Sequence, residues 1–287
     1  KPWIESDYAR VVEIEERYNS IVNVYTKRHY QPYTEVFPGL SNKLVPYQYQ
    51  KEAVTKILFD EYRTTLLDHS VGGGKTLTTI IAIMEAKRLG LSNRALITVM
   101  NSTVNQWKQA ILDAYPTANV VVLEAKDLNA KNRKKFIAQV ASTDADIFLM
   151  PYTAFERIKP SDDMAERFMR EEINLLRLDI SRTKEGGQSW GGALKQAEKQ
   201  LQKLEARLSL LLKSEKDDLV LFFDQMNIGF LAIDEFHNFK NLWFTHHMDK
   251  IAGLSNSASK RATDMYMKMQ HMIGRNRFVV TLTGSPF

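Results

Sequence analysis

Short apolar runs alternate along the chain with longer stretches in which apolar and polar residues follow a helical spacing. The short runs are TTLLD, RALITVM, NVVVLE, DIFLMP, GFLAID and RFVVTLTG. Helical patterns lie between several of them, as in TLTTIIAIMEAKRLG and VNQWKQAILDAY. The short runs are continuously apolar, which is typical of strands buried on both faces. The pattern predicts an α/β domain with a doubly wound, mostly parallel sheet.

The pattern changes between about Ser161 and Asp218, where the strand-like runs stop. Two helical patterns flank the segment GGQSWGG at 186–192. Their apolar positions are Met169, Ile173, Leu176 and Ile180, then Leu194, Ala197, Leu201, Leu204, Leu208 and Leu211. We expect an antiparallel helical hairpin inserted into the α/β domain. Two interpretations stay open: a structural arm, since such periodicity is normally packing, or an arm that binds a partner or guides DNA.

These boundaries divide the chain into three regions. Residues 1–42 are rich in Tyr, Arg and Glu and predict a mostly helical lead-in. Residues 43–160 and 219–287 together form the expected α/β domain, and residues 161–218 form the hairpin. The composition is 44% hydrophobic and 25% charged, which is ordinary for a globular protein.

Charge and cysteine content narrow the class of protein further. The net charge of +5 is compatible with nucleic-acid binding but also occurs in many proteins that bind none. No apolar run approaches the ~18 residues that a membrane span needs, and the N-terminus has no signal-peptide layout. The lack of cysteine excludes disulfides and cysteine-based zinc sites. We expect a cytoplasmic protein with no membrane partner.

The segment DHSVGGGKT at 68–76 lies between a predicted strand and a predicted helix. Phosphate-binding loops follow the formula G-x-x-x-x-G-K-[ST] in this context, although His69 replaces the first glycine here. Glycines let backbone N–H groups converge on phosphate, and the helix N-terminus adds partial positive charge. We predict that Lys75 reaches the β- and γ-phosphates and that Thr76 coordinates Mg²⁺. The remaining predicted nucleotide-binding residues are Gly72, Gly73, Gly74 and Leu77.

A second element of a nucleotide-hydrolysing site follows the strand at 228–233. The segment IGFLAIDEFHNFKN places Asp234 and Glu235 directly after this apolar run. In α/β proteins, ligand sites lie at the carboxyl ends of such strands. We predict that Asp234 holds Mg²⁺, through water, and that Glu235 is the catalytic base.

Five blocks, taken in order, resemble the motifs of superfamily-two helicases and translocases of the Snf type. They are YQKEAV (49–54), VGGGKT (71–76), LITVMNSTVNQW (96–107), DEFH with NFKN (234–241) and TLTGSP (281–286). The resemblance covers roughly residues 44–160 and 219–287. It implies a RecA-like P-loop lobe that binds ATP and Mg²⁺.

The resemblance also implies roles for residues outside the loop and the acidic pair. Gln50 matches the glutamine that reads adenine. Asn101, Ser102 and Thr103 match the motif that contacts a nucleic-acid backbone without sequence specificity. The third-motif residues Thr283, Gly284 and Ser285 are expected to couple the two sites, with Ser285 replacing a threonine. His237 is expected to relay hydrogen bonds to them; in isolation it suggests a metal ligand, but no second ligand lies at a suitable spacing.

A closer resemblance is to helicase-like proteins of phages, conjugative plasmids and integrative elements, often fused to an adenine-specific DNA methyltransferase. It is carried by FPGL, MEAKRLGL and AGLSNSASKRATDMYMK, among other segments. It implies a mobile-element protein of a bacterial or phage-infected cell. No DPPY- or NPPY-like tetrapeptide occurs, so methyltransferase activity is not expected in this chain. Such motors have a second RecA-like lobe with arginine fingers, and the chain stops after the third motif. We therefore expect little hydrolysis by this chain alone.

The predicted function is that of the first motor lobe of a DNA-dependent ATPase, either a helicase or a double-strand translocase. A non-catalytic ATP-binding or protein-interaction module is disfavoured by the intact Lys75, Thr76, Asp234 and Glu235. A small-molecule kinase is disfavoured by the acidic motif and TLTGSP. The basic residues at 131–135, 260–261, 275 and 277 are compatible with phosphate contacts or with a solvated helix face.

Overall fold

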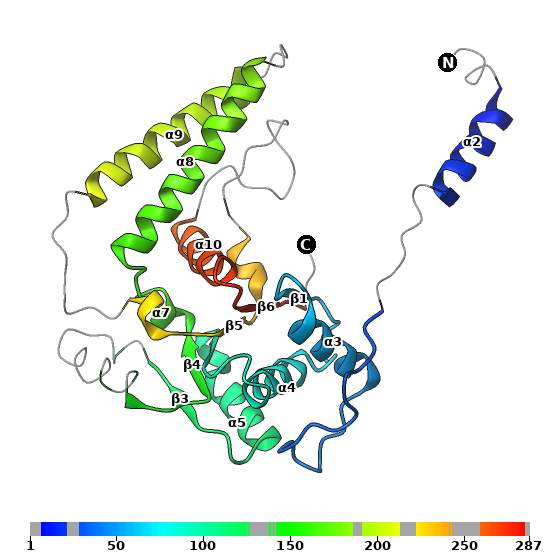
Figure 1. Cartoon of the computed structure of the whole chain (residues 1–287), viewed down its shortest axis with the longest axis vertical. Coiled ribbons are helices and arrows are strands. Elements are labelled where there is room, and N and C mark those ends of the chain that lie inside the picture. Colours follow the sequence, from blue (N-terminus) through cyan, green and yellow to red (C-terminus); the bar gives the residue numbers. More distant parts are fainter. Residues whose placement is uncertain are drawn as a thin grey trace. The chain divides into compact units, whose positions relative to one another are not determined.

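The computed structural model describes residues 7–21, 29–124, 126, 138, 140, 142–185, 191–212, 222–240, 242 and 259–284. The chain divides into two compact units, Lys1–Gln31 and Pro32–Phe287. In the first unit the structure describes helix α2 (Tyr8–Ile21). Both units are drawn in Figure 1. Among the described helices, none combines the length and the apolar character that a membrane span requires.

Six strands of the second unit form one sheet in the order β1-β6-β5-β2-β4-β3. They are β1 (Thr64–Leu67), β2 (Ala95–Val99), β3 (Val120–Val122), β4 (Ile147–Pro151), β5 (Phe230–Ile233) and β6 (Phe278–Leu282). Every neighbouring pair is parallel. All residues of β2, β4, β5 and β6 are buried, as their continuous apolar runs indicated. The predicted α/β fold with a parallel sheet is confirmed.

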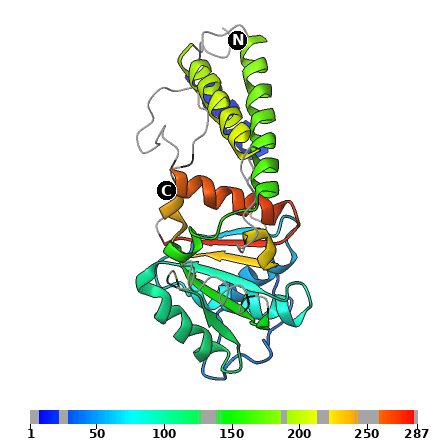
Figure 2. The same ribbon diagram turned by 90° about the vertical axis from the view of Figure 1, so that its left-hand side faces the viewer.

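Helices cover both faces of the sheet (Figure 2). One face carries α3 (Gln48–Phe59), α4 (Lys75–Arg88) and α5 (Val104–Ala114), and the other carries α7 (Tyr152–Phe155), the start of α8 (Asp162–Glu185) and α10 (Lys260–Ile273). Strand side chains alternate between the faces, so Ile97 packs in the first core and Leu96 in the second. Short 3₁₀ helices are η1 (Asn101–Thr103), η3 (Phe223–Met226) and η4 (Phe236–Phe239).

Part of the expected lead-in packs with the sheet unit. Phe37 is buried in the first core, although the sequence grouped it with residues 1–42. The Tyr33 hydroxyl donates to Glu85 on α4, and Arg88 donates to the same carboxylate at 2.8 Å. Burial and this carboxylate raise the pKa of Tyr33 to about 12. These contacts hold the segment before α3 against the C-terminal half of α4.

Helices α8 and α9 (Gly191–Leu211) form a helical arm that extends from the sheet unit (Figures 1 and 2). Arg177 pairs with Glu205 at 2.6 Å, and Lys184 pairs with Glu198 at 2.9 Å. Moving forward along α8 therefore means moving backward along α9, so the helices are antiparallel. The apolar stripe Ile173, Leu176 and Ile180 is buried between them together with Ala197.

The first turns of α8 pack in the core of the sheet unit rather than in the arm. Met164, Phe168 and Met169 belong to the same buried cluster as Leu231 of β5 and Val279 of β6. The range 161–218 that the sequence assigned to the hairpin thus includes part of this core.

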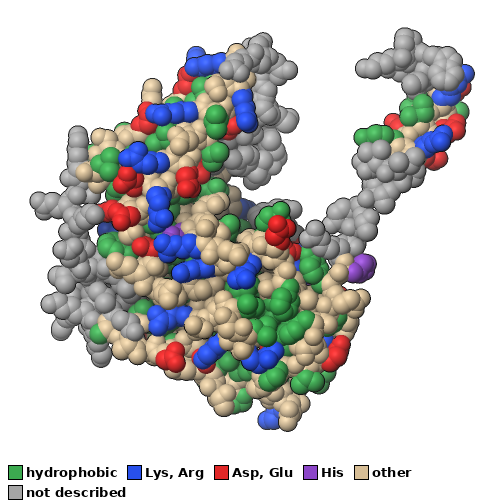
Figure 3. Space-filling model, in the orientation of Figure 1, with side chains coloured by type: hydrophobic (Ala, Val, Ile, Leu, Met, Phe, Trp, Pro, Cys, Tyr) green, Lys and Arg blue, Asp and Glu red, His purple; other side chains and the backbone are tan. Residues whose placement is uncertain are grey.

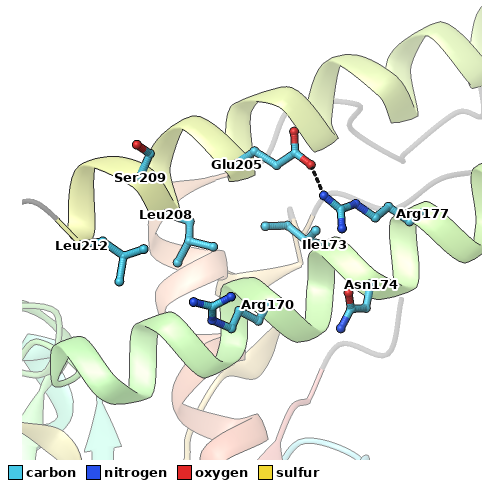
Figure 4. A pocket seen from close by; sticks show the side chains of 8 residues that line it. All are labelled: Arg170, Ile173, Asn174, Arg177, Glu205, Leu208, Ser209 and Leu212. Atoms are coloured by element: carbon cyan, nitrogen blue, oxygen red, sulfur yellow. Dashed lines mark hydrogen bonds and ion pairs between the residues drawn. The ribbon is translucent and has the colours of Figure 1, made fainter.

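Further out, α8 and α9 enclose a hollow of about 470 Å³ (Figure 4). Ile173, Leu208 and Leu212 point into it, and the Arg177–Glu205 ion pair crosses it.

Candidate functional site

The carboxyl ends of all six strands lie at one edge of the sheet, because the strands are parallel. In strand order, this edge presents the loop 68–74 after β1, Thr283 after β6, Asp234–Glu235 after β5, Asn101–Thr103 after β2 and Tyr152–Thr153 after β4. Ligands of open α/β sheets bind at this edge. Segments that lie far apart in the sequence therefore converge on one candidate site.

The glycines of the loop have conformations and neighbours that other residues would not accept. Gly72 and Gly74 have φ angles of +82° and +68°, in the left-handed region. A Cβ atom on Gly73 would lie 3.0 Å from the Ser70 carbonyl oxygen, and one on Gly74 would lie 2.0 Å from Gln50 Nε2. The loop therefore keeps a bare backbone surface in front of the N-terminus of α4.

Lys75 begins α4 and folds its side chain back over this loop. Its Nζ donates to the carbonyl oxygens of His69 at 2.7 Å and Ser70 at 3.1 Å. A Cβ atom on Gly284 would lie 3.5 Å from the same amine, so the third motif reaches the loop. Thr76 and Leu77 follow in the first turn of α4 and are half-buried. Burial lowers the pKa of His69, whose buried Nδ1 has no hydrogen-bond partner among the described atoms.

Gln50 connects α3 to the glycine-rich loop at 68–74. Its side chain is buried; Oε1 accepts from the Tyr47 backbone at 2.8 Å, and Nε2 donates to the Gly74 carbonyl at 3.4 Å. The Tyr49 hydroxyl donates to the Gly73 carbonyl at 3.2 Å. Both ends of the Gln50 amide thus already hold protein groups. Contact with adenine stays a prediction, which would use the remaining Nε2 proton or Oε1 lone pair.

Asp234 follows β5 and is held by two helices and by the next residue of the chain. Its Oδ2 accepts from Trp107 Nε1 at 2.8 Å, and its Oδ1 accepts from the Glu235 backbone at 3.0 Å. The Tyr152 hydroxyl donates to the Asp234 carbonyl oxygen. Burial raises the pKa of the Asp234 carboxyl, while the Trp107 hydrogen bond and the charge of Lys75 oppose this shift. Trp107 and Tyr152 were not predicted as site residues.

Glu235 and His237 form a pair beside β6. Glu235 has a φ of +47°, an uncommon value for a non-glycine residue that recurs at functional sites. His237 Nδ1 lies 3.3 Å from Glu235 Oε2 and 3.2 Å from Thr283 Oγ1. Both side chains are about one-third exposed, so the carboxylate is accessible to solvent. The expected partner Ser285 lies outside the described residues.

Asn101, Ser102 and Thr103 form η1, at the end of β2; Asn101 and Ser102 are exposed and Thr103 is half-buried. Thr153, from the first turn of α7, donates its hydroxyl to Asn101 Oδ1 at 3.3 Å. The polar turn after β2 therefore extends to the turn after β4. Sequence patterns missed Thr153 because only the adjacency of β2 and β4 brings it to Asn101.

The basic residues noted in the sequence differ in their contacts and in their position relative to the candidate site. Arg277 donates to the Ile228 carbonyl at 2.6 Å and to Asn227 Oδ1 at 3.0 Å, near the amino ends of β5 and β6. This position is opposite the candidate site and indicates a structural role. Arg261 pairs with Glu156 at 2.6 Å on the arm side of the sheet. The run at 131–135 lies outside the described residues.

The residues present fit a nucleotide phosphate chain with a divalent cation. The glycine loop leaves its backbone open, and the Lys75 amine is held by carbonyl groups rather than by a carboxylate. The described residues contain no cluster of three or more His, Cys, Asp or Glu side chains suited to a metal. Mg²⁺ in phosphate sites needs few protein ligands, because waters and phosphate oxygens complete its octahedron. Thr76 and Asp234 are the residues that would hold such an ion.

A family model described as "Probable helicase domain" matches residues 58–284. The comparison with curated proteins finds no match. Among solved structures, the chain is similar to a Sulfolobus solfataricus SWI2/SNF2 ATPase core in complex with dsDNA, with 16% identity and a TM-score of 0.41. The match covers 88% of this chain but 35% of the other, so the chain spans about a third of that length.

Proposed function

Because the chain belongs to the "Probable helicase domain" family, we propose that it is the ATP-binding first motor lobe of a DNA-dependent helicase or translocase. One observation carries the proposal: the phosphate loop, the acidic pair and a polar turn lie at the same edge of one parallel sheet. A motor needs nucleotide and nucleic acid to meet the same rigid scaffold, so that binding of one alters binding of the other.

In this proposal the loop backbone and Lys75 bind the phosphates of ATP. Lys75 exchanges the carbonyl groups of His69 and Ser70 for phosphate oxygens, which form stronger, charge-assisted hydrogen bonds. Thr76 and Asp234 would hold Mg²⁺, which neutralises charge on the phosphates. Glu235 orients or deprotonates the attacking water, for which its partly exposed carboxylate is suited.

His237 and Trp107 connect the hydrolytic residues to other parts of the lobe. His237 lies between Glu235 and Thr283, so a change at the acidic pair reaches the end of β6. Trp107 connects Asp234 to α5, whose preceding turn carries Asn101, Ser102 and Thr103. We propose that these two connections couple the nucleotide to the nucleic acid.

The nucleic acid is proposed to contact Asn101, Ser102 and Thr103, with Thr153 as an additional donor. Short polar side chains suit phosphate oxygens and carry no base specificity. A second RecA-like lobe would supply arginine fingers for charge on the transferring phosphoryl group. A bacterial or phage mobile-element origin, a cytoplasmic location and an attached methyltransferase domain belong to the same proposal.

The test is ATP hydrolysis by the natural full-length protein, measured with and without double-stranded DNA. We expect DNA to stimulate turnover and Glu235→Gln to abolish it while ATP stays bound. If DNA does not change the rate of ATP hydrolysis while Glu235→Gln still abolishes it, the motor function is contradicted and the protein is an ATPase of another kind. Bound ATP without any turnover would favour the non-catalytic ATP-binding module.

A further inference from the structure

A hollow of about 920 Å³ lies where the base of the helical arm meets α7 and α10. We refer to it as the arm-base groove. Its lining contains five basic side chains, Arg157, Lys159, Arg207, Lys260 and Arg261, and three acidic ones, Glu156, Asp162 and Asp264. Figure 3 shows Lys and Arg side chains along the arm, interspersed there with Asp and Glu, and further Lys and Arg side chains on the surface below its base.

Two of the three acidic side chains of the groove are paired, one of them with a basic side chain of the groove itself. Glu156 pairs with Arg261 at 2.6 Å, and Asp264 pairs at 2.7 Å with Lys268, which is fully buried. No ion pair among the described residues involves Lys159, Arg207 or Lys260. The arm-base groove therefore carries surplus positive charge.

This charge comes from separate elements that converge on one place. Arg207 lies on α9 and Lys260 on α10. Burial raises the pKa of Asp264, and the charges of Arg207 and Lys260 partly oppose this rise, so both lie near the same carboxylate. Lys159 lies between α7 and α8. Convergence of three chain segments distinguishes the groove from a single solvated helix face, where a run of like charges has no common target.

The groove is also continuous with the polar turn at the sheet edge. Thr153 lines the groove and donates its hydroxyl to Asn101 at 3.3 Å. A nucleic-acid strand bound at Asn101, after β2, would next contact Thr153, after β4, and then the basic residues at the arm base. The strand order β5-β2-β4 sets this sequence of contacts.

We propose that the arm-base groove binds the phosphodiester backbone of a nucleic acid and continues the track that begins at Asn101, Ser102 and Thr103. The inference rests on the proposed function, since it requires that this lobe contact nucleic acid. A volume of about 920 Å³ is that of a large ligand pocket and fits a short length of one backbone rather than the full width of a duplex. Binding should therefore depend on salt and not on base sequence.

The experiment measures binding of fluorescein-labelled duplex DNA, single-stranded DNA and RNA to the chain by fluorescence anisotropy over a series of salt concentrations. Lys159→Glu and Arg207→Glu should each weaken binding several-fold and lower the slope of log K against log salt by about 1. Lys195→Glu is the matched control, because it lies on α9 about 18 Å from Arg207 along the helix, beyond the ~8 Å Debye length. All three lysine and arginine side chains are exposed, so melting temperatures should stay unchanged.

Three results would overturn the inference. If the groove variants bind like Lys195→Glu while Asn101→Ala loses binding, the groove is not part of the track and the proposed function stands. If the wild-type chain binds none of the three nucleic acids yet binds ATP, the lobe does not contact nucleic acid by itself. If polyglutamate displaces DNA as well as an equal charge of unlabelled DNA does, the groove binds acidic chains in general. The tightest-binding of the three probes identifies the class of nucleic acid.

Discussion

The hydrogen bond from Trp107 to Asp234 is expected to stabilise both the fold and the carboxylate that is proposed to hold Mg²⁺. Trp107 is buried on α5, and its indole N–H is its one donor. Trp107→Phe keeps an aromatic ring in place but leaves Asp234 Oδ2 without the partner that now lies at 2.8 Å. Burial already raises the pKa of Asp234, so loss of this hydrogen bond should raise it further.

The magnitude follows from the charge of the acceptor. A hydrogen bond to a charged group contributes about 1.5–3 kcal/mol to stability. The smaller phenyl ring also leaves a cavity, whose cost must be separated from that of the hydrogen bond. A double-mutant cycle of Trp107→Phe and Asp234→Ala makes this separation, because the cavity term is present with and without Asp234. We expect a coupling free energy of about 1.5–3 kcal/mol at neutral pH.

The assay is urea unfolding followed by far-ultraviolet circular dichroism, since tryptophan fluorescence changes with the substitution itself. ATP affinity in the presence of Mg²⁺ should also fall for Trp107→Phe, although Trp107 is on a different helix from the phosphate loop. If the free energies of the two single variants add to within about 0.5 kcal/mol, the hydrogen bond does not couple α5 to the acidic pair. That result would refute the proposed connection between the two sites.

Three further predictions concern the loop, a buried histidine and the arm. Gly74→Ala should lose ATP binding and destabilise by more than Gly90→Ala, because both have positive φ but only Gly74 meets Gln50; equal urea-unfolding effects would contradict this. Burial lowers the pKa of His271 to about 4, so stability should fall as pH drops below the unfolded value of about 6.5, where the unfolded chain binds the extra proton. His271→Gln should weaken this dependence, and an unchanged profile of melting temperature against pH would exclude His271. A Gly/Ser linker in place of 178–204 should leave a folded, ATP-binding lobe, whereas deletion of 161–218 should unfold it in a thermal melt; two equally stable deletions would show that α8 contributes nothing to the core.

The sheet could be predicted because its signals are local, and the prediction of a phosphate-binding loop rests on a signal of the same kind. Each buried strand is a continuous apolar run, and the loop combines glycine, lysine and threonine within a few residues. The antiparallel hairpin also had a local signal, the apolar stripe that includes Ile173 and Leu176. Its boundary did not, because Met164 and Phe168 have the same spacing whether they pack on α9 or on the sheet.

The contacts that organise the candidate site could not be predicted from local patterns. Trp107 and Asp234 are 127 positions apart and meet because β2 and β5 are neighbours in the sheet. Thr153 reaches Asn101 for the same reason, through β4. Strand order decides such pairs, and no short segment encodes strand order. The hydrogen bonds of the Gln50 amide to Tyr47 and Gly74 likewise could not be predicted from the sequence.

The central claim is that the loop before α4 binds the phosphates of ATP through Lys75. Isothermal titration calorimetry with ATP and Mg²⁺ tests it directly, on the wild-type chain, Lys75→Ala and Lys43→Ala. Lys43 is exposed and distant from the sheet edge, near the end of α5, and its replacement changes the net charge equally. We predict weak binding by the wild-type chain and by Lys43→Ala, and none by Lys75→Ala. Equal affinity of Lys75→Ala and the wild-type chain would contradict the claim.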